Sequence, residues 1–208
     1  MKKIALIVSV AALSIFMTAA MVSADRNSWR GFHGEYAMSG SGNCIYSTDG
    51  FYPNNIPQNI AADKTWGAYY TVEGIWNFEP NNTGTFQGKQ FGMAPYPYPY
   101  PNSTSVEFSF DFKYTVDHDG FITGNMKDGS FLGEYITGPN AGKTPARTYT
   151  VDKFSFSGWV SQDHKNITLN SGSELQTFTV FRPDLTVPDS VTLPGICTNE
   201  RILILINK

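Results

Sequence analysis

The stretch VEFSFDFKYTV, residues 106–116, alternates apolar and polar side chains without a break. Every even-numbered residue in it is apolar and every odd-numbered residue is polar. A period of two is the pattern of a β-strand with one face on a core and the other in water. Because this half-buried pattern is typical of antiparallel sheets, the stretch predicts an antiparallel β fold.

Turn residues follow this strand closely. The dipeptide Asp-Gly occurs at 119–120, before residues 121–126, and again at 128–129, before residues 130–136. Asp-Gly between strand-like segments indicates a tight hairpin, because glycine adopts the positive φ that the turn needs. We therefore expect three consecutive antiparallel strands here. Further strands are expected at residues 34–40, 66–78, 84–91, 147–159, 166–170, 174–181 and 201–206.

Roughly ten short strands joined by tight turns are typical of a closed all-β fold, and 208 residues are enough for one such domain. The expected fold class is a single-domain antiparallel up-and-down β-barrel. A β-sandwich is the alternative, because it shows the same alternation and the same turn signals.

Residues 1–24 are expected to be a signal peptide. Lys2 and Lys3 precede an apolar run over residues 4–21, and residues 22–24, VSA, offer small side chains at the positions that a signal peptidase reads. Cleavage after residue 24 would export a single domain, residues 25–208, to the periplasm or the extracellular space. An uncleaved membrane anchor is the alternative, and no stable membrane insertion is expected once the signal is removed.

The charge of the chain limits its expected binding partners. The chain has 15 Lys and Arg against 18 Asp and Glu, and loss of Lys2 and Lys3 leaves about thirteen against eighteen. Without a basic cluster, nucleic acid is not an expected partner.

The two cysteines, Cys44 and Cys197, are expected to form one disulfide in an oxidising compartment.

Residues 117–120, DHDG, share two ligand positions with a calcium-binding loop. The first and last ligand positions would fall on Thr115 and Met126, so a plain hairpin turn is favoured and no metal is expected. No nucleophile or phosphate-binding motif is present in the sequence. No catalytic residue and no cofactor are therefore predicted.

Gly34-Glu35-Tyr36 opens the first expected strand, and Arg201 lies in the last one, behind Cys197. In this layout the chain resembles the calycin superfamily, the lipocalins and their relatives. Those proteins begin with a Gly-x-Trp strand and place a late Arg or Lys across the aromatic ring. The resemblance implies a barrel-closing contact in which Arg201 stacks on Tyr36, although Tyr here replaces the Trp of the family pattern.

The chain also resembles uncharacterised exported bacterial β-barrel proteins. They carry a Phe-Tyr-rich strand, an Asp-Gly turn, a Thr-Val-Asp-Lys-Phe-Ser segment and a late Cys followed by Arg. These features correspond here to residues 108–116, 119–120 and 150–155, and to Cys197 with Arg201. This resemblance implies no established activity.

Aromatic residues make up 14% of the chain, so they either fill the core or line an interior cavity. The leading hypothesis is a non-catalytic protein that binds a small apolar or aromatic ligand inside the barrel. The candidate ligand-binding residues are Tyr36, Trp66, Trp76, Phe110, Phe112 and Trp159.

Two other functions stay open. One is a surface or matrix interaction protein that uses exposed aromatics, including those of the Tyr-Pro run, to bind an unknown protein partner. The other is a small-barrel enzyme of the isomerase or cyclase kind, which would carry a buried group with a shifted pKa. The run PYPYPYP at residues 95–101 is expected to be a stiff rim loop, because proline cannot donate to a sheet. Its tyrosines Tyr96, Tyr98 and Tyr100 would either cover the barrel mouth or stand in solvent.

Overall fold

A computed structural model describes Trp29 and residues 32–61, 63–94, 102–137, 148–171, 175–182 and 189–208. None of these residues is helical, so no described helix could cross a membrane. The expected signal peptide and the Tyr-Pro run lie outside the described residues. The described strands are β1 (Gly34–Ser47), β2 (Thr65–Phe78), β3 (Thr83–Ala94), β4 (Asn102–Val116), β5 (Phe121–Met126), β6 (Leu132–Tyr135), β7 (Thr148–Val151), β8 (Ser155–Val160), β9 (Asn166–Ser171), β10 (Leu175–Arg182) and β11 (Asp189–Asn207).

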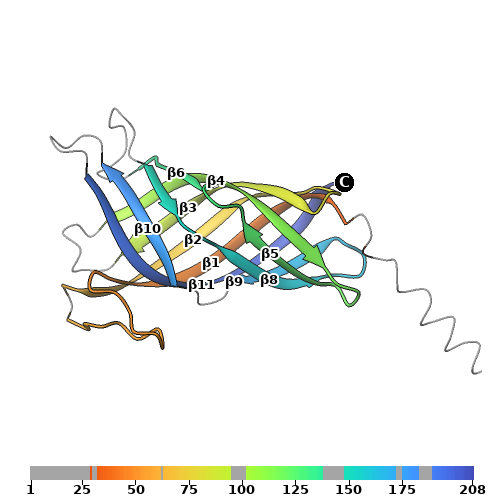
Figure 1. The fold of residues 1–208 in the computed structure, drawn as a ribbon. Coiled ribbons are helices and arrows are strands. Elements are labelled where there is room, and N and C mark those ends of the chain that lie inside the picture. Colours follow the sequence, from red (N-terminus) through yellow and green to blue (C-terminus); the bar gives the residue numbers. More distant parts are fainter. Residues whose placement is uncertain are drawn as a thin grey trace, which may run out of the picture.

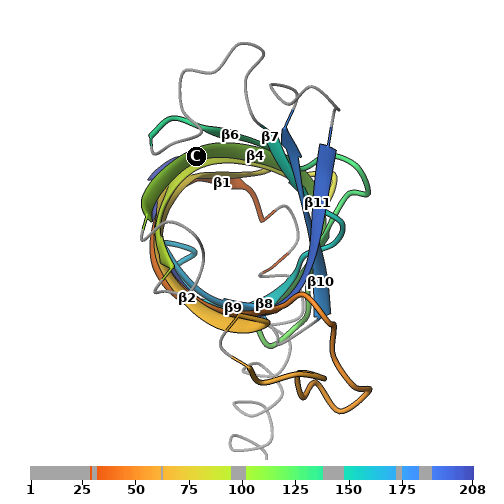
Figure 2. The same ribbon diagram turned by 90° about the vertical axis from the view of Figure 1, so that its left-hand side faces the viewer.

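These strands form one antiparallel sheet that closes on itself. The order β1-β2-β3-β4-β5-β8-β9-β11 is completed by pairing of β11 with β1, so eight strands form a ring. The strands run obliquely along the molecule (Figure 1) and surround a common axis when the ring is viewed from its end (Figure 2). The expectation of an all-β antiparallel fold is therefore confirmed.

The three remaining strands continue the ring at one end. β6 pairs with β4 beyond β5, and β10 pairs with β11 beyond β9. β7 bridges β6 and β10, just as β8 bridges β5 and β9. Since β5 and β6 are both antiparallel to β4, they run in the same direction, one after the other. The same holds for β7 and β8 and for β9 and β10, so eight strand positions surround the axis along its length.

The predicted hairpin at residues 128–129 is consequently wrong. Phe112 pairs with Met126 and Ser109 pairs with Leu132, so residues 127–131 lie opposite only two residues of β4. The backbone N–H of Ser130 donates to the carbonyl of Lys127, which closes a local turn within a strand that then continues. The predicted strand 147–159 is interrupted in the same way, between β7 and β8. The turn at residues 119–120 does join two hairpin strands, with Gly120 at φ 89°.

Side chains of alternate residues point into the ring, and many of the buried ones are aromatic. Trp76 is 1% exposed, and its ring lies 4.8 Å from the ring of Phe112, 4.9 Å from Phe156, 5.3 Å from Phe86 and 5.6 Å from Phe110. Each buried aromatic ring stabilises the folded state by about 2–3 kcal/mol, because it removes apolar surface from water. This part of the interior is a packed hydrophobic core.

One end of the ring, where β1 begins and β11 ends, is covered by the residues that precede β1. We call it the sealed end. The indole of Trp29 stacks on His164 at 4.8 Å and donates from Nε1 to the carbonyl of His118 at 3.0 Å. Phe32 packs edge-on against Tyr114, whose hydroxyl donates to the Phe32 carbonyl at 2.7 Å. The opposite end, where β1 ends and β2 begins, is the far end.

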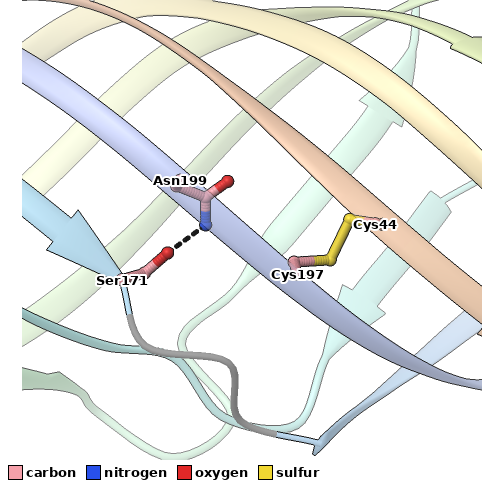
Figure 3. The surroundings of a disulfide bond; sticks show 4 residues. All are labelled: Cys44, Ser171, Cys197 and Asn199. Carbon is pink, nitrogen blue, oxygen red and sulfur yellow. Dashed lines mark hydrogen bonds between the residues drawn. A yellow bond between two sulfur atoms is a disulfide. The ribbon is translucent and has the colours of Figure 1, made fainter. Parts of the chain in front are cut away.

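The predicted disulfide is confirmed. Cys44 of β1 and Cys197 of β11 are direct partners in the sheet, with 4.1 Å between their Cα atoms, and both are buried. The bridge therefore joins the first strand to the last at the seam that closes the ring (Figure 3). It lies inside the ring, between the packed core and the far end.

Replacing both cysteines by alanine should lower the free energy of unfolding by about 3–5 kcal/mol, because the bridge restricts a loop of 153 residues in the unfolded chain. Urea denaturation followed by fluorescence measures this difference. Dithiothreitol should destabilise the wild-type protein to a similar extent and leave the double variant unchanged. Equal urea midpoints for the oxidised protein and the double variant would contradict the prediction.

Candidate functional site

The interior contains a small group of polar side chains between the aromatic core and the far end. The buried polar or charged side chains among the described residues are Ser47, Ser171, Gln176, Asn199 and Arg201. Three of them, Ser171, Asn199 and Arg201, lie near the seam together with the buried Tyr70, and Figure 3 shows Ser171 and Asn199 beside the disulfide. We call this group the polar cluster; its members are Tyr70, Ser171, Asn199 and Arg201.

Strand register explains why these residues meet. Asn199 of β11 pairs with Gly42 of β1 on one side and with Ser171 of β9 on the other. Gly42 in turn pairs with Tyr70 of β2, so the four residues form one row across the inner face of the sheet. Arg201 follows Asn199 by two residues and points to the same side, because side chains alternate along a strand.

Two glycines of β1 leave space for these side chains. A Cβ on Gly42 would stand 2.6 Å from Cζ of Tyr70 and closer still to Oδ1 of Asn199. A Cβ on Gly40 would stand 2.8 Å from Cγ of Arg201. Both distances are far shorter than an ordinary carbon contact, so only glycine lets Tyr70, Asn199 and Arg201 lie against β1.

Arg201 is the only charged side chain among the buried described residues. Its guanidinium lies over the ring of Phe154, with 4.8 Å from Cζ to the ring centroid. Its Nη1 is buried and has no hydrogen-bond partner, and no described carboxylate forms an ion pair with it. Burial lowers the pKa of Arg201, opposed by the nearby Tyr70, yet an arginine stays protonated under all ordinary conditions.

The neighbours of Arg201 offer further hydrogen-bonding atoms. Burial raises the pKa of Tyr70 to about 12 and the charge of Arg201 opposes that rise, so the Tyr70 hydroxyl is protonated at neutral pH. The amide Nδ2 of Asn199 donates to Oγ of Ser171 (Figure 3), while Oδ1 of Asn199 is buried without a partner. The polar cluster thus combines one cation, two hydroxyls and one amide in a largely apolar interior.

Aromatic rings border the polar cluster on the far-end side. Tyr46 stacks on Trp66 at 6.0 Å and meets Phe178 edge-on at 5.2 Å. Burial raises the pKa of Tyr46, with smaller contributions from Tyr70 and Tyr135. We call Tyr46, Trp66 and Phe178 the far-end rings.

The residues singled out from the sequence separate into three regions. Trp76, Phe110 and Phe112 lie together in the packed core, Trp66 belongs to the far-end rings, and Tyr36 lies near the sealed end. Trp159 does not share the interior with them: it is 55% exposed on the outer face, beside Phe121. The expected rim tyrosines, Tyr96, Tyr98 and Tyr100, lie outside the described residues.

The expected contact between Tyr36 and Arg201 is wrong. Tyr36 pairs with Leu205 in the sheet, and its hydroxyl donates to the carbonyl of His164 at 2.7 Å. Arg201 pairs with Gly40 instead, about 13 Å further along the seam, and stacks on Phe154. Arg201 therefore belongs to the polar cluster and takes no part in sealing the end near Tyr36.

The sequence analysis missed most of the polar cluster, although one signal was present. Cys197, Asn199 and Arg201 are spaced by two, so a strand places them on one face. A disulfide at Cys197 that faces the interior would have directed Asn199 and Arg201 inward as well. No comparable signal marked Tyr70 or Ser171, because their roles depend on pairing with distant strands.

Two other features lie on the surface. Asp117, His118 and Asp119 bring their potential metal-ligand atoms within 4.8 Å of one another, but all three are exposed. Oδ1 of Asp117 accepts hydrogen bonds from two backbone N–H groups of the turn, which accounts for its position. A groove of about 600 Å³ also crosses the outer face of β1 to β4 and β6; its lining includes Glu73, Ile75, Lys89, Glu107, Leu132 and Glu134.

Replacing Arg201 by methionine should raise the free energy of unfolding of the ligand-free protein by about 1–3 kcal/mol. The substitution keeps a long side chain over Phe154 and removes a buried charge, whose desolvation costs several kcal/mol. That gain should exceed the lost cation–π energy of about 2 kcal/mol. Urea denaturation measures the change.

The matched control is Lys113→Met, which removes an exposed cation from the outer face of β4 and should change stability by less than about 0.5 kcal/mol. Clear destabilisation by Arg201→Met alone would show that the guanidinium is well paired in the folded protein.

The site is thus defined by its own geometry: a buried cation, three polar neighbours and bordering aromatic rings inside a closed ring of strands. No family model matches the chain, and no curated protein matches it.

Proposed function

We propose that this chain is an exported, non-catalytic β-barrel protein that binds a small apolar or aromatic ligand inside the ring, between the polar cluster and the far-end rings. The observation that carries the proposal is the polar cluster itself. Buried polar groups are normally hydrogen-bonded, and leaving one unpaired costs about 1–3 kcal/mol. Unpaired atoms on both Asn199 and Arg201 are expected where a ligand completes the bonding.

The aromatic core is not the proposed binding region. Trp76, Phe110 and Phe112 are 1–4% exposed and touch one another closely, so they leave the ligand no room. Small barrels either fill their interior with side chains or hold one small ligand. We propose that this barrel does the first near the sealed end and the second near the far end.

Export and the barrel class have their own support. The disulfide is consistent with an oxidising compartment, as the expected signal peptide requires. The sheet order follows the chain, with each strand position next to the one before it and the last next to the first. That order is typical of an up-and-down barrel such as the calycins.

Binding can be tested with N-phenyl-1-naphthylamine, an uncharged probe whose fluorescence rises in apolar surroundings. The wild-type protein should bind it saturably with a stoichiometry near one. Ala68 faces the interior between Trp66 and Tyr70 and is only half-buried, so Ala68→Phe should fill the proposed site and weaken binding about tenfold or more.

The control is Thr71→Phe, which adds the same ring to the outer face of the same strand. It should leave the titration unchanged. Absence of saturable binding to the folded wild-type protein, or equal weakening by both variants, would refute the proposal.

A second candidate function, adhesion to a surface or protein partner, is favoured by an apolar stripe on the outer face. Ile202, Ile204 and Ile206 of β11 are 55–59% exposed. Thr168 lies between Ile202 and the exposed Trp159 in the sheet, so the stripe continues onto β8. Exposed apolar surface of this kind often marks an interaction site.

If the stripe mediates adhesion, Ile204→Lys should abolish partner capture in a pull-down while leaving probe binding and the melting temperature unchanged. The matched control is Thr85→Lys, which places the same charge on the outer face of β3, away from the stripe. Unchanged capture by Ile204→Lys would exclude this role for the stripe.

A further inference from the structure

We infer that the ligand of the interior site carries a carboxylate and that Arg201 receives it, with the Tyr70 hydroxyl as a second donor. This inference rests on the proposed function, because it names the chemical group by which the small ligand is held. The expected ligand is therefore an amphipathic acid: an apolar or aromatic body that lies against the far-end rings, and one negative charge that reaches the polar cluster.

The first argument is charge balance. Arg201 is a permanent cation that is 9% exposed, and the buried described residues contain no carboxylate. Phe154 covers one face of the guanidinium, but a ring face cannot accept the hydrogen bonds that lie in the guanidinium plane. Nη1 is left without a partner, so its in-plane N–H groups are available for an anion.

The second argument is the position of the neighbouring groups. Gly40 and Gly42 have no side chains, and Arg201, Asn199 and Tyr70 lie over the space that this leaves. The Tyr70 hydroxyl is close enough to Arg201 for the positive charge to affect its pKa. A protonated hydroxyl beside a guanidinium can donate to the same carboxylate, so two side chains from β2 and β11 converge on one anion.

Asn199 can adapt to that anion. Rotation of its amide by 180° keeps a hydrogen bond to Ser171, because a hydroxyl both donates and accepts. After rotation the N–H group faces Tyr70 in place of the unpartnered Oδ1. Asn199 would then add a third donor at the same point.

The third argument selects a carboxylate from the possible anions. The planar guanidinium fork matches the two oxygens of a carboxylate, which accept two parallel hydrogen bonds. The buried described residues contain one cation, which balances one negative charge. A phosphate monoester would bring nearly two charges at neutral pH and would need a second cation.

Displacement of N-phenyl-1-naphthylamine by 2-naphthoate and by 2-naphthamide at neutral pH tests the inference. The two compounds have the same shape and differ in charge, so their ratio isolates the carboxylate. For the wild-type protein, 2-naphthoate should bind about 10- to 100-fold more tightly than 2-naphthamide, as expected for charge-assisted hydrogen bonds.

Arg201→Met should abolish this preference by weakening 2-naphthoate alone, with the affinity for 2-naphthamide changed less than about threefold. Tyr70→Phe, which keeps the ring, should reduce the preference by about three- to tenfold, and it also serves as the test if Arg201→Met does not fold. Lys113→Met removes an equal charge from the outer face and should leave the preference unchanged.

The outcomes separate the two proposals. Saturable probe binding with equal affinity for acid and amide, or with displacement by neither, overturns the carboxylate inference and leaves the proposed function standing. An acid preference that survives both Arg201→Met and Tyr70→Phe also overturns it. Failure of the folded wild-type protein to bind the probe overturns the proposed function itself.

Discussion

The pairing of β1 with β11 is the constraint on which the rest of the structure depends. These strands are far apart in sequence, and their ladder turns a curved sheet into a closed ring with an inner and an outer face. The disulfide crosses this seam at Cys44 and Cys197. Residues on both sides of the seam, Gly40 and Gly42 in β1 and Asn199 and Arg201 in β11, then form one wall of the candidate site. The strand pairing that closes the ring therefore also brings the residues of the candidate site together.

The interior divides into two regions with different energetics. Around Trp76, close contacts between aromatic rings stabilise the fold, and the indole nitrogen of Trp76 is buried without a hydrogen-bond partner. Around Arg201, glycines replace bulky side chains on one strand, and polar groups take the space. A core optimised only for stability would not bury an unpaired cation, because its desolvation is unfavourable. The unpaired polar atoms therefore lower the stability of the ligand-free fold, and the proposed ligand would offset that cost.

Sequence patterns predicted the sheet well where they reflect local physics. The alternation over residues 106–116 identified most of β4, the Asp-Gly dipeptide at 119–120 identified its hairpin, and two cysteines identified their bridge. The alternation along β8 also indicated where Trp159 points. Trp159 lies on the same face of the strand as Ser155 and Ser157, opposite to the buried Phe156. Its size favoured an interior position, but its place in the strand directed it outward.

Strand ends and the site were harder to predict, because both depend on long-range pairing. Glycines and polar residues beyond Gly40 resemble a turn, yet β1 continues to Ser47 since its neighbours require a partner there. Pro194 and Gly195 also resemble turn residues, yet they lie within the first half of β11. The contact expected between Arg201 and Tyr36 failed because only the register along the seam decides which residue an arginine meets.

The seam also sets the order in which the molecule can be completed. Cys44 cannot meet Cys197, at a sequence separation of 153, until the chain between them has been made and its ends brought together. Before that moment β1 has β2 on one side and an unpaired edge on the other, and such an edge can recruit strands from other chains. Contacts of this sequence separation form slowly. The period before closure is therefore when the chain is most exposed to aggregation, and a partner that covers the free edge of β1 would protect it most.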